Sequence, residues 1–206
     1  MIFDYGNVLS APQSLEHVEN MARVFDLPPE RFKELYWQFR IPYDAAILTP
    51  EDYWNTVARA ASRTIAADEI SRVTKADNYS WSHPARAVGG WAGQLRAAGL
   101  KTAILSNMPV PVRDYVLGRP WLPDFDVRVF SCEIGVCKPA LEIYHECIAK
   151  LGTAPSEILF LDDREANVRA AEALGLHAIR FTELRAAAAE IDRRFSFPVT
   201  LSNLIA

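Results

Sequence analysis

Chemically active side chains follow several short apolar stretches of this sequence. An acid follows the first stretch, a hydroxyl and amide pair follows a later one, a lysine comes next, and two adjacent acids follow another stretch. In chain order these residues are Asp4, Ser106, Asn107, Lys138, Asp162 and Asp163. If the stretches are parallel strands of one open sheet, their carboxyl ends share an edge, so the six side chains can meet there.

This set of side chains fits the transfer of a phosphoryl group. A carboxylate such as Asp4 can accept the phosphoryl group, but its charge repels a phosphate unless a cation neutralises it. Mg²⁺ does so and prefers carboxylates, a backbone carbonyl and water as ligands. Asp4 and the backbone carbonyl of Gly6 could supply some of these ligands. The adjacent pair Asp162 and Asp163 could supply the others.

The lysine and the hydroxyl would add to this chemistry. Lys138 offers a positive charge for the phosphate and the nucleophile, and Ser106 with nearby backbone N–H groups can hold the oxygens of the transferred group. Each feature alone also has a structural explanation, because an Asp pair can cap a helix, Ser-Asn can form a turn and Lys-Pro can begin a helix. Their occurrence together, each at a strand end, favours a catalytic site.

From Pro84 onward the apolar pattern alternates between strands and helices. Strands are expected at 1–3, 101–105, 127–131, 157–161 and 177–181. Helices of about ten to fifteen residues separate the later strands, which indicates βαβ units. Two of these helices are expected to end at Gly99 and Gly175, since glycine suits a C-terminal cap. The sequence therefore predicts an α/β fold with a doubly wound parallel sheet.

The segment between the first strand and Pro84 has a different character. From Ser14 to about Arg72 it is helix-periodic, with runs that are broken at Pro28-Pro29 and over 42–50. The apolar stripes of these runs predict a small helical bundle with its own core. We therefore expect an α/β core formed by 1–13 and 84–206, and a helical insertion at 14–83.

The helical segment carries aromatic and basic residues with two possible roles. They are Trp37, Arg40, Tyr43 and Trp54. Such residues could line a substrate pocket, but aromatic residues at helical spacing are more often part of a core. Both interpretations stay open at the level of the sequence.

Composition limits the class of protein and its partners. The 206 residues are 50% hydrophobic and 23% charged, which is typical of a globular protein with a sizeable core. The net charge is −4 and no run of basic residues occurs, so we expect neither a nucleic acid nor a membrane as partner. No apolar run approaches the ~18 residues of a membrane helix, and Met1 lies too close to Asp4 for a cleavable signal. A cytoplasmic location is therefore expected.

The cysteines and histidines do not indicate a disulfide framework or a zinc site. Cys132, Cys137 and Cys147 are an odd number without a C-x-x-C pair, and the four histidines lie far apart. Cys147 falls on the apolar face of an expected helix, so we expect it in the core rather than in catalysis.

Four segments together resemble the motifs of the haloacid dehalogenase superfamily of hydrolases: 3–9, 103–109, 131–144 and 156–179. The Gly-Val-x-Lys-Pro spacing in the third and the Asp-Asp pair in the fourth are similar to those of bacterial sugar-phosphate phosphatases and of the N-terminal phosphatase domain of soluble epoxide hydrolases. The resemblance implies a Rossmann-like core with a helical cap after the first motif. It also implies a Mg²⁺-dependent phosphatase that works through an aspartyl-phosphate.

By motif position, the resemblance implies roles for the residues of the core. Asp4 would be the nucleophile and a metal ligand. Ser106 and Asn107 would bind the phosphate, and Lys138 would neutralise charge and contact the substrate.

The fourth motif and the cap add further expected roles. Asp163 would bind the metal directly, with Asp162 beside it as a second ligand or as support. Asn167 stands where many relatives carry a further acid that supports the metal-bound water. Arg40, from the helical cap, is an additional candidate for substrate binding.

The sequence departs from the family pattern at Gly6. Relatives usually carry there a second aspartate, which protonates the leaving group and then activates water. General acid–base help of this kind is typically worth ~10²–10⁴ in rate. The neighbouring Asn7 cannot replace it, because an amide does not titrate. Glycine can also adopt backbone conformations that other residues cannot, and we expect one at residue 6. A variant with another residue there must therefore be checked for correct folding.

Three functions remain open on these grounds. The first is a Mg²⁺-dependent phosphatase acting on a small phosphorylated metabolite. The second is a 2-haloacid dehalogenase, whose halide leaving group needs no acid, although that chemistry would not require the pair Asp162 and Asp163. The third is a catalytically weak protein that binds a phosphorylated metabolite. The sequence does not distinguish a monomer from a homodimer.

Overall fold

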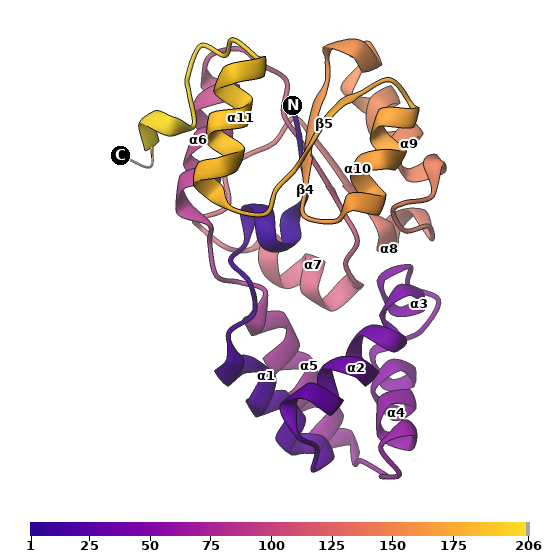
Figure 1. The fold of residues 1–206 in the computed structure, drawn as a ribbon. Coiled ribbons are helices and arrows are strands. Elements are labelled where there is room, and N and C mark those ends of the chain that lie inside the picture. The colour runs from indigo at the N-terminus through magenta and orange to yellow at the C-terminus, as the bar shows by residue number, and fades with distance from the viewer. Residues whose placement is uncertain (205–206) are drawn as a thin grey trace.

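The computed structural model describes residues 1–204, which form a sheet flanked by helices and a group of helices below it (Figure 1). The strands are β1 Ile2–Phe3, β2 Ala103–Ser106, β3 Val127–Phe130, β4 Leu159–Asp162 and β5 His177–Arg180. The α-helices are α1 Leu15–Ala22, α2 Pro29–Gln38, α3 Arg40–Asp44, α4 Pro50–Ala60, α5 Ala67–Ser80, α6 Arg86–Ala97, α7 Val110–Leu117, α8 Ser131–Ile134, α9 Leu141–Leu151, α10 Glu165–Ala173 and α11 Leu184–Arg194. The shorter helical turns are η1 Tyr5–Leu9, η2 Arg23–Phe25, η3 Pro155–Glu157 and η4 Ser202–Leu204.

The five strands run parallel in the order β3-β2-β1-β4-β5. β1 has only two residues but lies at the centre, because Ile2 pairs with Ala103 of β2 and with Phe160 of β4. The chain builds β2 and β3 on one side of β1 and then crosses to build β4 and β5 on the other. The predicted doubly wound α/β fold is confirmed. This order places a switch point at the carboxyl end of β1, where ligands bind in such sheets.

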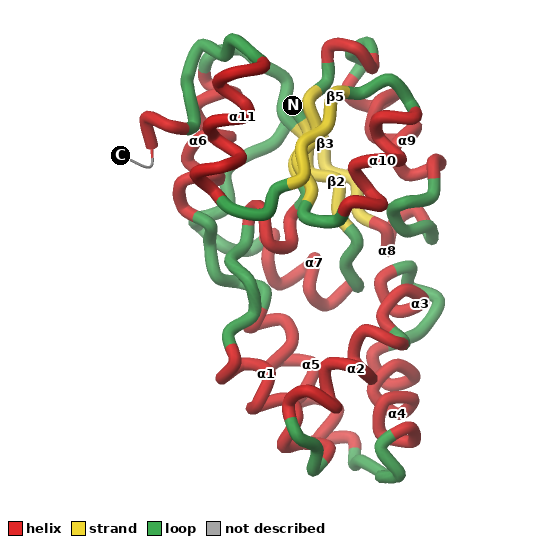
Figure 2. The backbone as a smooth tube through the Cα atoms, viewed as in Figure 1, coloured by secondary structure: helices red, strands yellow, loops and turns green. Residues whose placement is uncertain are grey.

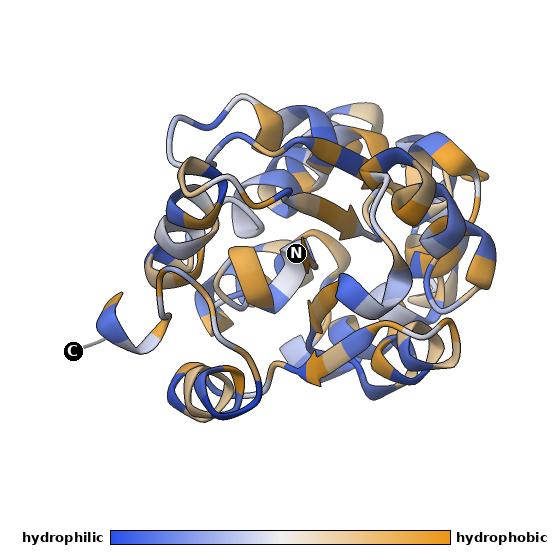
Figure 3. Cartoon of the chain, turned by 90° about the horizontal axis from the view of Figure 1, so that it is seen from above, coloured by the Kyte–Doolittle hydropathy of each residue, from blue (hydrophilic) through white to orange (hydrophobic). Residues whose placement is uncertain are grey.

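Alternating side chains of the strands bury an apolar core on each face of the sheet. Phe3 and Ile104 pack toward α6 and α11, whereas Ile2 and Leu105 pack toward α9 and α10. Cys147 of α9 belongs to the second core, as predicted. Figure 2 shows the two pairs of helices on opposite sides of the strands. In Figure 3 the strands near the centre are largely coloured as hydrophobic, while the surrounding helices alternate between the two colours.

Helices α1, α2, α4 and α5 pack around an apolar core of their own. The predicted bundle is therefore present, but the prediction was wrong in two details. The helical pattern was followed only to about Arg72, whereas α5 continues to Ser80. The stretch from Pro42, expected to break the helices, begins inside α3. None of the helices found over residues 1–204 is long and apolar enough to cross a bilayer.

The chain passes between the sheet and the helical bundle twice, and the two passages lie side by side. The N–H of Ala11 donates to the carbonyl of His83 at 2.7 Å, and the N–H of Ala85 donates to the carbonyl of Leu9 at 2.9 Å. A second contact joins the far side of the bundle to the sheet, where the hydroxyl of Ser131 donates to the carbonyl of Asp44 at 2.6 Å. The division of the chain at residues 14 and 84 stays a prediction.

Candidate active site

Asp4 lies where β1 ends, and the neighbouring strand fixes its position. Its backbone N–H donates to the carbonyl of Leu161 in β4 at 2.8 Å. The carboxylate is buried, and its Oδ1 accepts a hydrogen bond from the N–H of Tyr5 at 2.7 Å. Oδ1 also lies 2.8 Å from Nζ of Lys138. Oδ2 has no hydrogen-bond partner in the described part of the chain.

Lys138 connects this carboxylate to the acids of the fourth motif. Its ammonium group is almost fully buried and lies 2.8 Å from Oδ1 of Asp4 and 2.6 Å from Oδ2 of Asp162. It also donates to the carbonyl of Leu105 at 2.8 Å. An ammonium has three N–H groups, so these three acceptors satisfy it. Lys138 therefore neutralises the carboxylates of the protein itself.

Asp162, the last residue of β4, is surrounded by donors. Its Oδ1 accepts from the backbone N–H of Arg164 at 2.8 Å and from the side chain of Asn167 at 2.9 Å. Its Oδ2 accepts from Lys138, and the same Asn167 amide lies 3.0 Å from it. Asn167 thus donates to Asp162, in the position where relatives were expected to carry an acid. Both oxygens of Asp162 are engaged by the protein.

Asp163 has a more open environment. Its Oδ2 accepts from the side-chain amide of Asn7 at 2.8 Å, and this is its one hydrogen bond from a side chain in the described part of the chain. Asn7 has a positive φ of 60°, a conformation that asparagine tolerates better than most residues, and it lies in the turn predicted after the first strand. The turn therefore brings an amide to Asp163 and leaves its second oxygen without a donor.

The charges at this edge of the sheet are not balanced. Carboxylate oxygens of Asp4, Asp162 and Asp163 all lie within 4.8 Å of one another, and among residues 1–204 Lys138 is the one cation in a salt bridge with them. Burial raises the pKa of Asp4, Lys138 opposes this shift, and the other two acids add to it. Burial alone would lower the pKa of Lys138, but Asp162 and Asp4 outweigh it and hold its pKa above the usual value.

The donor set fits a divalent cation of the Mg²⁺ type. An additional cation would offset the excess negative charge, and Asp4 and Asp163 each have one carboxylate oxygen without a protein donor. Gly6 lines the same cavity, so its carbonyl is a further oxygen nearby. Hard oxygen ligands in this combination are those that Mg²⁺ prefers. Asp162 differs, because protein donors already occupy both of its oxygens.

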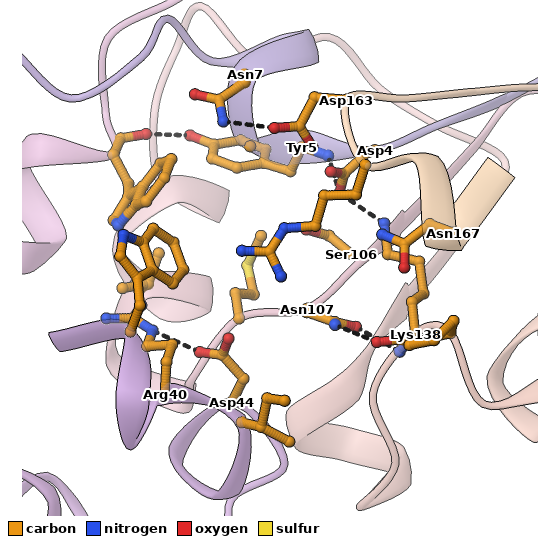
Figure 4. Close-up of a pocket in the computed structure, with 18 of the residues that line it drawn as sticks. Asp4, Tyr5, Asn7, Arg40, Asp44, Ser106, Asn107, Lys138, Asp163 and Asn167 are labelled. Carbon is orange, nitrogen blue, oxygen red and sulfur yellow. Dashed lines mark hydrogen bonds and ion pairs between the residues drawn. The ribbon is translucent and has the colours of Figure 1, made fainter. Parts of the chain in front are cut away.

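Ser106 and Asn107 reach the same cavity, but they are bound differently. Ser106 is buried, and its hydroxyl makes no hydrogen bond to the described residues. The Asn107 side chain exchanges two hydrogen bonds with the backbone of Lys138, at 2.9 and 2.8 Å (Figure 4). One N–H of the Asn107 amide remains for a ligand. The Ser106 hydroxyl is thus the freer of the two groups.

Gly6 has an ordinary backbone conformation, with φ −64° and ψ 128°. Any residue can adopt it, so the expectation of a conformation special to glycine was wrong. A Cβ atom at this position would meet the ring of Trp81 at 3.4 Å, which is an ordinary contact. The backbone at residue 6 would therefore also allow an aspartate.

A cavity of about 360 Å³ lies above these residues, with one wall formed by the helical bundle. Figure 4 shows Arg40 and Asp44 on the wall opposite Asp4 and Asp163. Trp37 also lines this wall. Cavities of this size accept small molecules rather than macromolecules.

Arg40 lines the cavity but is held by the bundle. Its Nε donates to Asp44 at 2.7 Å, and its Nη1 donates to Asp77 at 2.9 Å and to the hydroxyl of Tyr36. Burial would lower the pKa of this guanidinium, but Asp77 and the other partners raise it. Arg40 therefore neutralises buried acids of the bundle, and its predicted role in substrate binding stays a prediction.

Of the aromatic candidates, one lines the cavity and two belong to the core of the bundle. Trp37 is 41% exposed and lines the cavity, whereas Tyr43 and Trp54 are buried in the core of the bundle. Sequence reasoning missed Trp81 and Arg164, which also line the cavity. Arg164 follows the Asp162-Asp163 pair directly, and this position at a strand end could have identified it.

The sequence is similar to a known protein family and to several characterised proteins. A sequence model of the family described as haloacid dehalogenase-like hydrolase matches residues 23–175. Acyl-CoA dehydrogenase family member 10 of Mus musculus is 39% identical over 114 residues, which are 52% of this chain and 10% of that protein. The sesquiterpene phosphatase AstK of Aspergillus oryzae is 29% identical over 101 residues, 48% of this chain and 50% of that protein. The matches thus span half or less of these relatives.

Solved structures show the same fold at low sequence identity. An enzyme of the same superfamily from Bacteroides thetaiotaomicron, in complex with magnesium and inorganic phosphate, matches with a TM-score of 0.68 and 20% identity over 88% of this chain and 94% of that chain. The L-2-haloacid dehalogenase of Xanthobacter autotrophicus, with chloropropionic acid covalently bound, matches with a TM-score of 0.67 and 20% identity over 99% and 86% of the two chains. Because the family model covers more than half of the sequence, the chain belongs to the haloacid dehalogenase-like hydrolase family.

Proposed function

We propose that this hydrolase is a Mg²⁺-dependent phosphatase that acts on a small phosphorylated metabolite through an aspartyl-phosphate. The observation that carries the proposal is the buried group of three carboxylates within 4.8 Å of one another, paired with a single lysine at the floor of a cavity. A phosphatase of this type needs a nucleophilic carboxylate and a divalent cation, and this group offers both.

In the proposed reaction Oδ2 of Asp4 attacks the phosphorus atom of the substrate. The bond from phosphorus to the leaving oxygen breaks, and this oxygen departs with the electron pair and takes a proton from water or from the substrate itself, since Gly6 offers none. Water then attacks the aspartyl-phosphate, which releases inorganic phosphate and restores the Asp4 carboxylate. Lys138 fixes Oδ1 of Asp4, so the other oxygen points to the cavity side.

The remaining residues of the floor position the phosphate and the cation. The hydroxyl of Ser106 and one amide N–H of Asn107 donate to phosphate oxygens. The free oxygen of Asp163, the carbonyl of Gly6 and the Asp4 oxygen that does not attack phosphorus would hold Mg²⁺. When bound, Mg²⁺ supplies charge that offsets the repulsion between carboxylate and phosphate. Asp162 and Asn167 support this arrangement without binding the cation.

The relatives support the phosphatase over the second candidate, a 2-haloacid dehalogenase. The AstK relative is named a phosphatase, whereas the structural neighbours include both an enzyme with magnesium and phosphate and a 2-haloacid dehalogenase. The observation that favours the dehalogenase is Gly6, because a halide leaves without a proton. The cluster of three acids paired with Lys138 argues against the dehalogenase. Such a cluster suits a divalent cation, and displacement of a halide by a carboxylate does not require one.

The test is release of phosphate from 4-nitrophenyl phosphate with and without Mg²⁺. We expect release that depends on Mg²⁺ and falls to below a few per cent in Asp4→Asn, because the amide keeps the shape of the side chain and loses its nucleophilic charge. Circular dichroism of the variant checks that the fold is kept. Chloride release from 2-chloropropionate without phosphate release would favour the dehalogenase. Binding of phosphate without turnover of either substrate would favour a binding protein.

A further inference from the structure

Arg164 has an unusual position between the sheet and the helical bundle. It follows Asp163 directly, and its backbone N–H is fixed by Asp162 at 2.8 Å. Its side chain lines the cavity and extends to the bundle, where the guanidinium carbon lies 5.1 Å from the ring centroid of Trp37 in α2. The guanidinium therefore lies at the boundary between the carboxylate floor and the opposite wall.

Arg164 differs from the other two cations that line the cavity. Lys138 is satisfied by three acceptors, and Arg40 is paired with Asp44 and Asp77. The guanidinium of Arg164 has no hydrogen bond and no ion pair with any of residues 1–204. Its planar N–H donors thus rest on an indole face with nothing from the protein to accept them.

The surroundings of Arg164 limit what can bind it. Asp44 is the acid of the opposite wall. Arg40 holds its Oδ1, and the charges of Arg40 and Arg164 both oppose the rise in the pKa of Asp44 that burial causes. Five large or medium-sized apolar residues also line the cavity: Trp37, Ile41, Trp81, Met108 and Val112. A substrate whose phosphate lies over Asp4 must therefore place the rest of its structure among apolar side chains and near a guanidinium that has no hydrogen-bond partner among residues 1–204.

We propose that Arg164, supported by Trp37, binds an oxyanion carried by the leaving group of the substrate. The inference rests on the proposed phosphatase function and deepens it. The substrate class is a small phosphomonoester whose leaving group has an apolar part and a second negative group, a carboxylate or another phosphate. A guanidinium matches the geometry of both groups with two parallel hydrogen bonds. Arg164 thus determines which substrates bind. This role does not replace the proton donor that is missing at Gly6.

The experiment measures binding, so it does not depend on turnover. Isothermal titration calorimetry of Asp4→Asn with Mg²⁺ compares three probes of similar size: 4-carboxyphenyl phosphate, 1,4-phenylene bisphosphate and the neutral 4-carbamoylphenyl phosphate. We expect at least one anionic probe to bind ten- to a hundredfold more tightly than the neutral probe, a range that corresponds to about one charged hydrogen-bonded pair. The anionic probe preferred, carboxylate or phosphate, identifies the oxyanion.

Two double variants complete the test, each with one further substitution added to Asp4→Asn. Arg164→Gln should reduce the preference to about one, because an amide keeps hydrogen-bonding capacity and loses the charge. Arg169→Gln is the matched control, since Arg169 lies in α10, the helix that begins directly after Arg164, is exposed and pairs with Glu165. It should leave the preference unchanged. Equal binding of all three probes, or a preference that survives Arg164→Gln, overturns the inference.

The two proposals fail separately. If the wild-type protein releases phosphate from 4-nitrophenyl phosphate but shows no preference for an anionic leaving group, the phosphatase function stands and the role of Arg164 is wrong. The other outcome is a binding preference in Asp4→Asn that depends on Arg164, with no phosphate released from any probe by the wild-type protein. The oxyanion site then stands and the phosphatase function is wrong.

Discussion

Asp162 and Asp163 are neighbours in the sequence, but their carboxylates have opposite environments. Donors from three residues occupy both oxygens of Asp162, while the described residues give the Asp163 carboxylate one donor, the amide of Asn7. A carboxylate with all its oxygens engaged is part of the protein framework, whereas one with a free oxygen can bind a cation. This difference supports the proposal that Asp163 binds the cation directly while Asp162 supports the site.

The first prediction at this scale separates the two acids by metal affinity and stability. Asp163→Asn should weaken Mg²⁺ binding by at least tenfold with little change in stability, because a free carboxylate oxygen is lost. Asp162→Asn should instead lower the free energy of unfolding by about 1–3 kcal/mol, since buried donors from Lys138, Arg164 and Asn167 lose their charged acceptor while Lys138 keeps Asp4. Calorimetric Mg²⁺ titration and urea denaturation measure the two effects. The opposite order of Mg²⁺ affinities would assign the ligand to Asp162.

The second prediction concerns the leaving group. Without an acid at residue 6, activity should fall steeply from aryl or acyl phosphates to simple alkyl phosphates, because the departing oxygen becomes more basic. Gly6→Asp should flatten this slope by raising the slow substrates most, and its backbone angles allow the substitution. The rates are compared across a series of phosphate esters.

Gly6→Ala is the control, because it adds the Cβ contact with Trp81 without a carboxylate. It should leave the slope as steep as in the wild-type protein. A wild-type slope that is already flat, with chemistry shown to be rate-limiting, would mean that another residue donates the proton.

Sequence reasoning found the site residues that stand at strand ends, because a parallel sheet brings its carboxyl ends together whatever the loop lengths. It could not find Asn7 as the partner of Asp163, since this contact depends on the positive φ of one turn residue. It also could not show that Arg40 is satisfied within the bundle, because its partner Asp77 lies in a helix that the sequence pattern did not separate.

At the scale of the elements, the strands were easier to predict than the helices of the bundle. β1 is apolar throughout, and β2 and β4 are apolar up to their last residue, while the edge strands β3 and β5 also contain charged or polar residues. The expected and observed ends of all five strands differ by two residues or fewer. α3 was missed because Pro42 was interpreted as a break, whereas proline is tolerated in the first turn of a helix, where its missing N–H is not needed. α5 was only partly identified because its exposed face is rich in polar residues.

The third prediction concerns the ion pairs that join α3 to α5. Arg40→Met should lower the free energy of unfolding by about 3–5 kcal/mol, because Asp44 and Asp77 would remain buried without their cation. Arg31→Met on α2 is the comparison, since Arg31 pairs with Glu34 at the surface and should change stability by less than ~1 kcal/mol. Chemical denaturation of both variants measures the difference. Equal effects would contradict a structural role for Arg40.

At the scale of the whole molecule, the cavity exists because the bundle is docked on the sheet. The hydroxyl of Ser131 is central to this contact, since it accepts from the N–H of Met108 at 3.0 Å and donates to the carbonyl of Asp44 at 2.6 Å. One hydroxyl thus joins the loop after β2 to the end of α3. The distance between the carboxylate floor and the opposite wall depends on such contacts.

The fourth prediction tests this docking. Ser131→Ala should lower the free energy of unfolding by about 1–3 kcal/mol, because two buried backbone groups lose their partner. It should also raise KM for 4-nitrophenyl phosphate more than it lowers kcat, since the wall moves and the floor does not. Thr74→Ala is the control, because its hydroxyl bonds only within α5. Steady-state kinetics that show a loss in kcat alone would contradict the expected role.

The paired passages of the chain between sheet and bundle have a consequence for how such a protein diversifies. Residues 9–11 and 83–85 are hydrogen-bonded to each other, so the helical segment leaves the sheet and returns to it at a single place. Insertions are tolerated where the two ends of the inserted piece meet. Any other segment with adjoining ends could therefore be exchanged at this place while β1 keeps its register with β2 and β4. A lineage can replace the helical wall of the cavity and still inherit the same acidic edge.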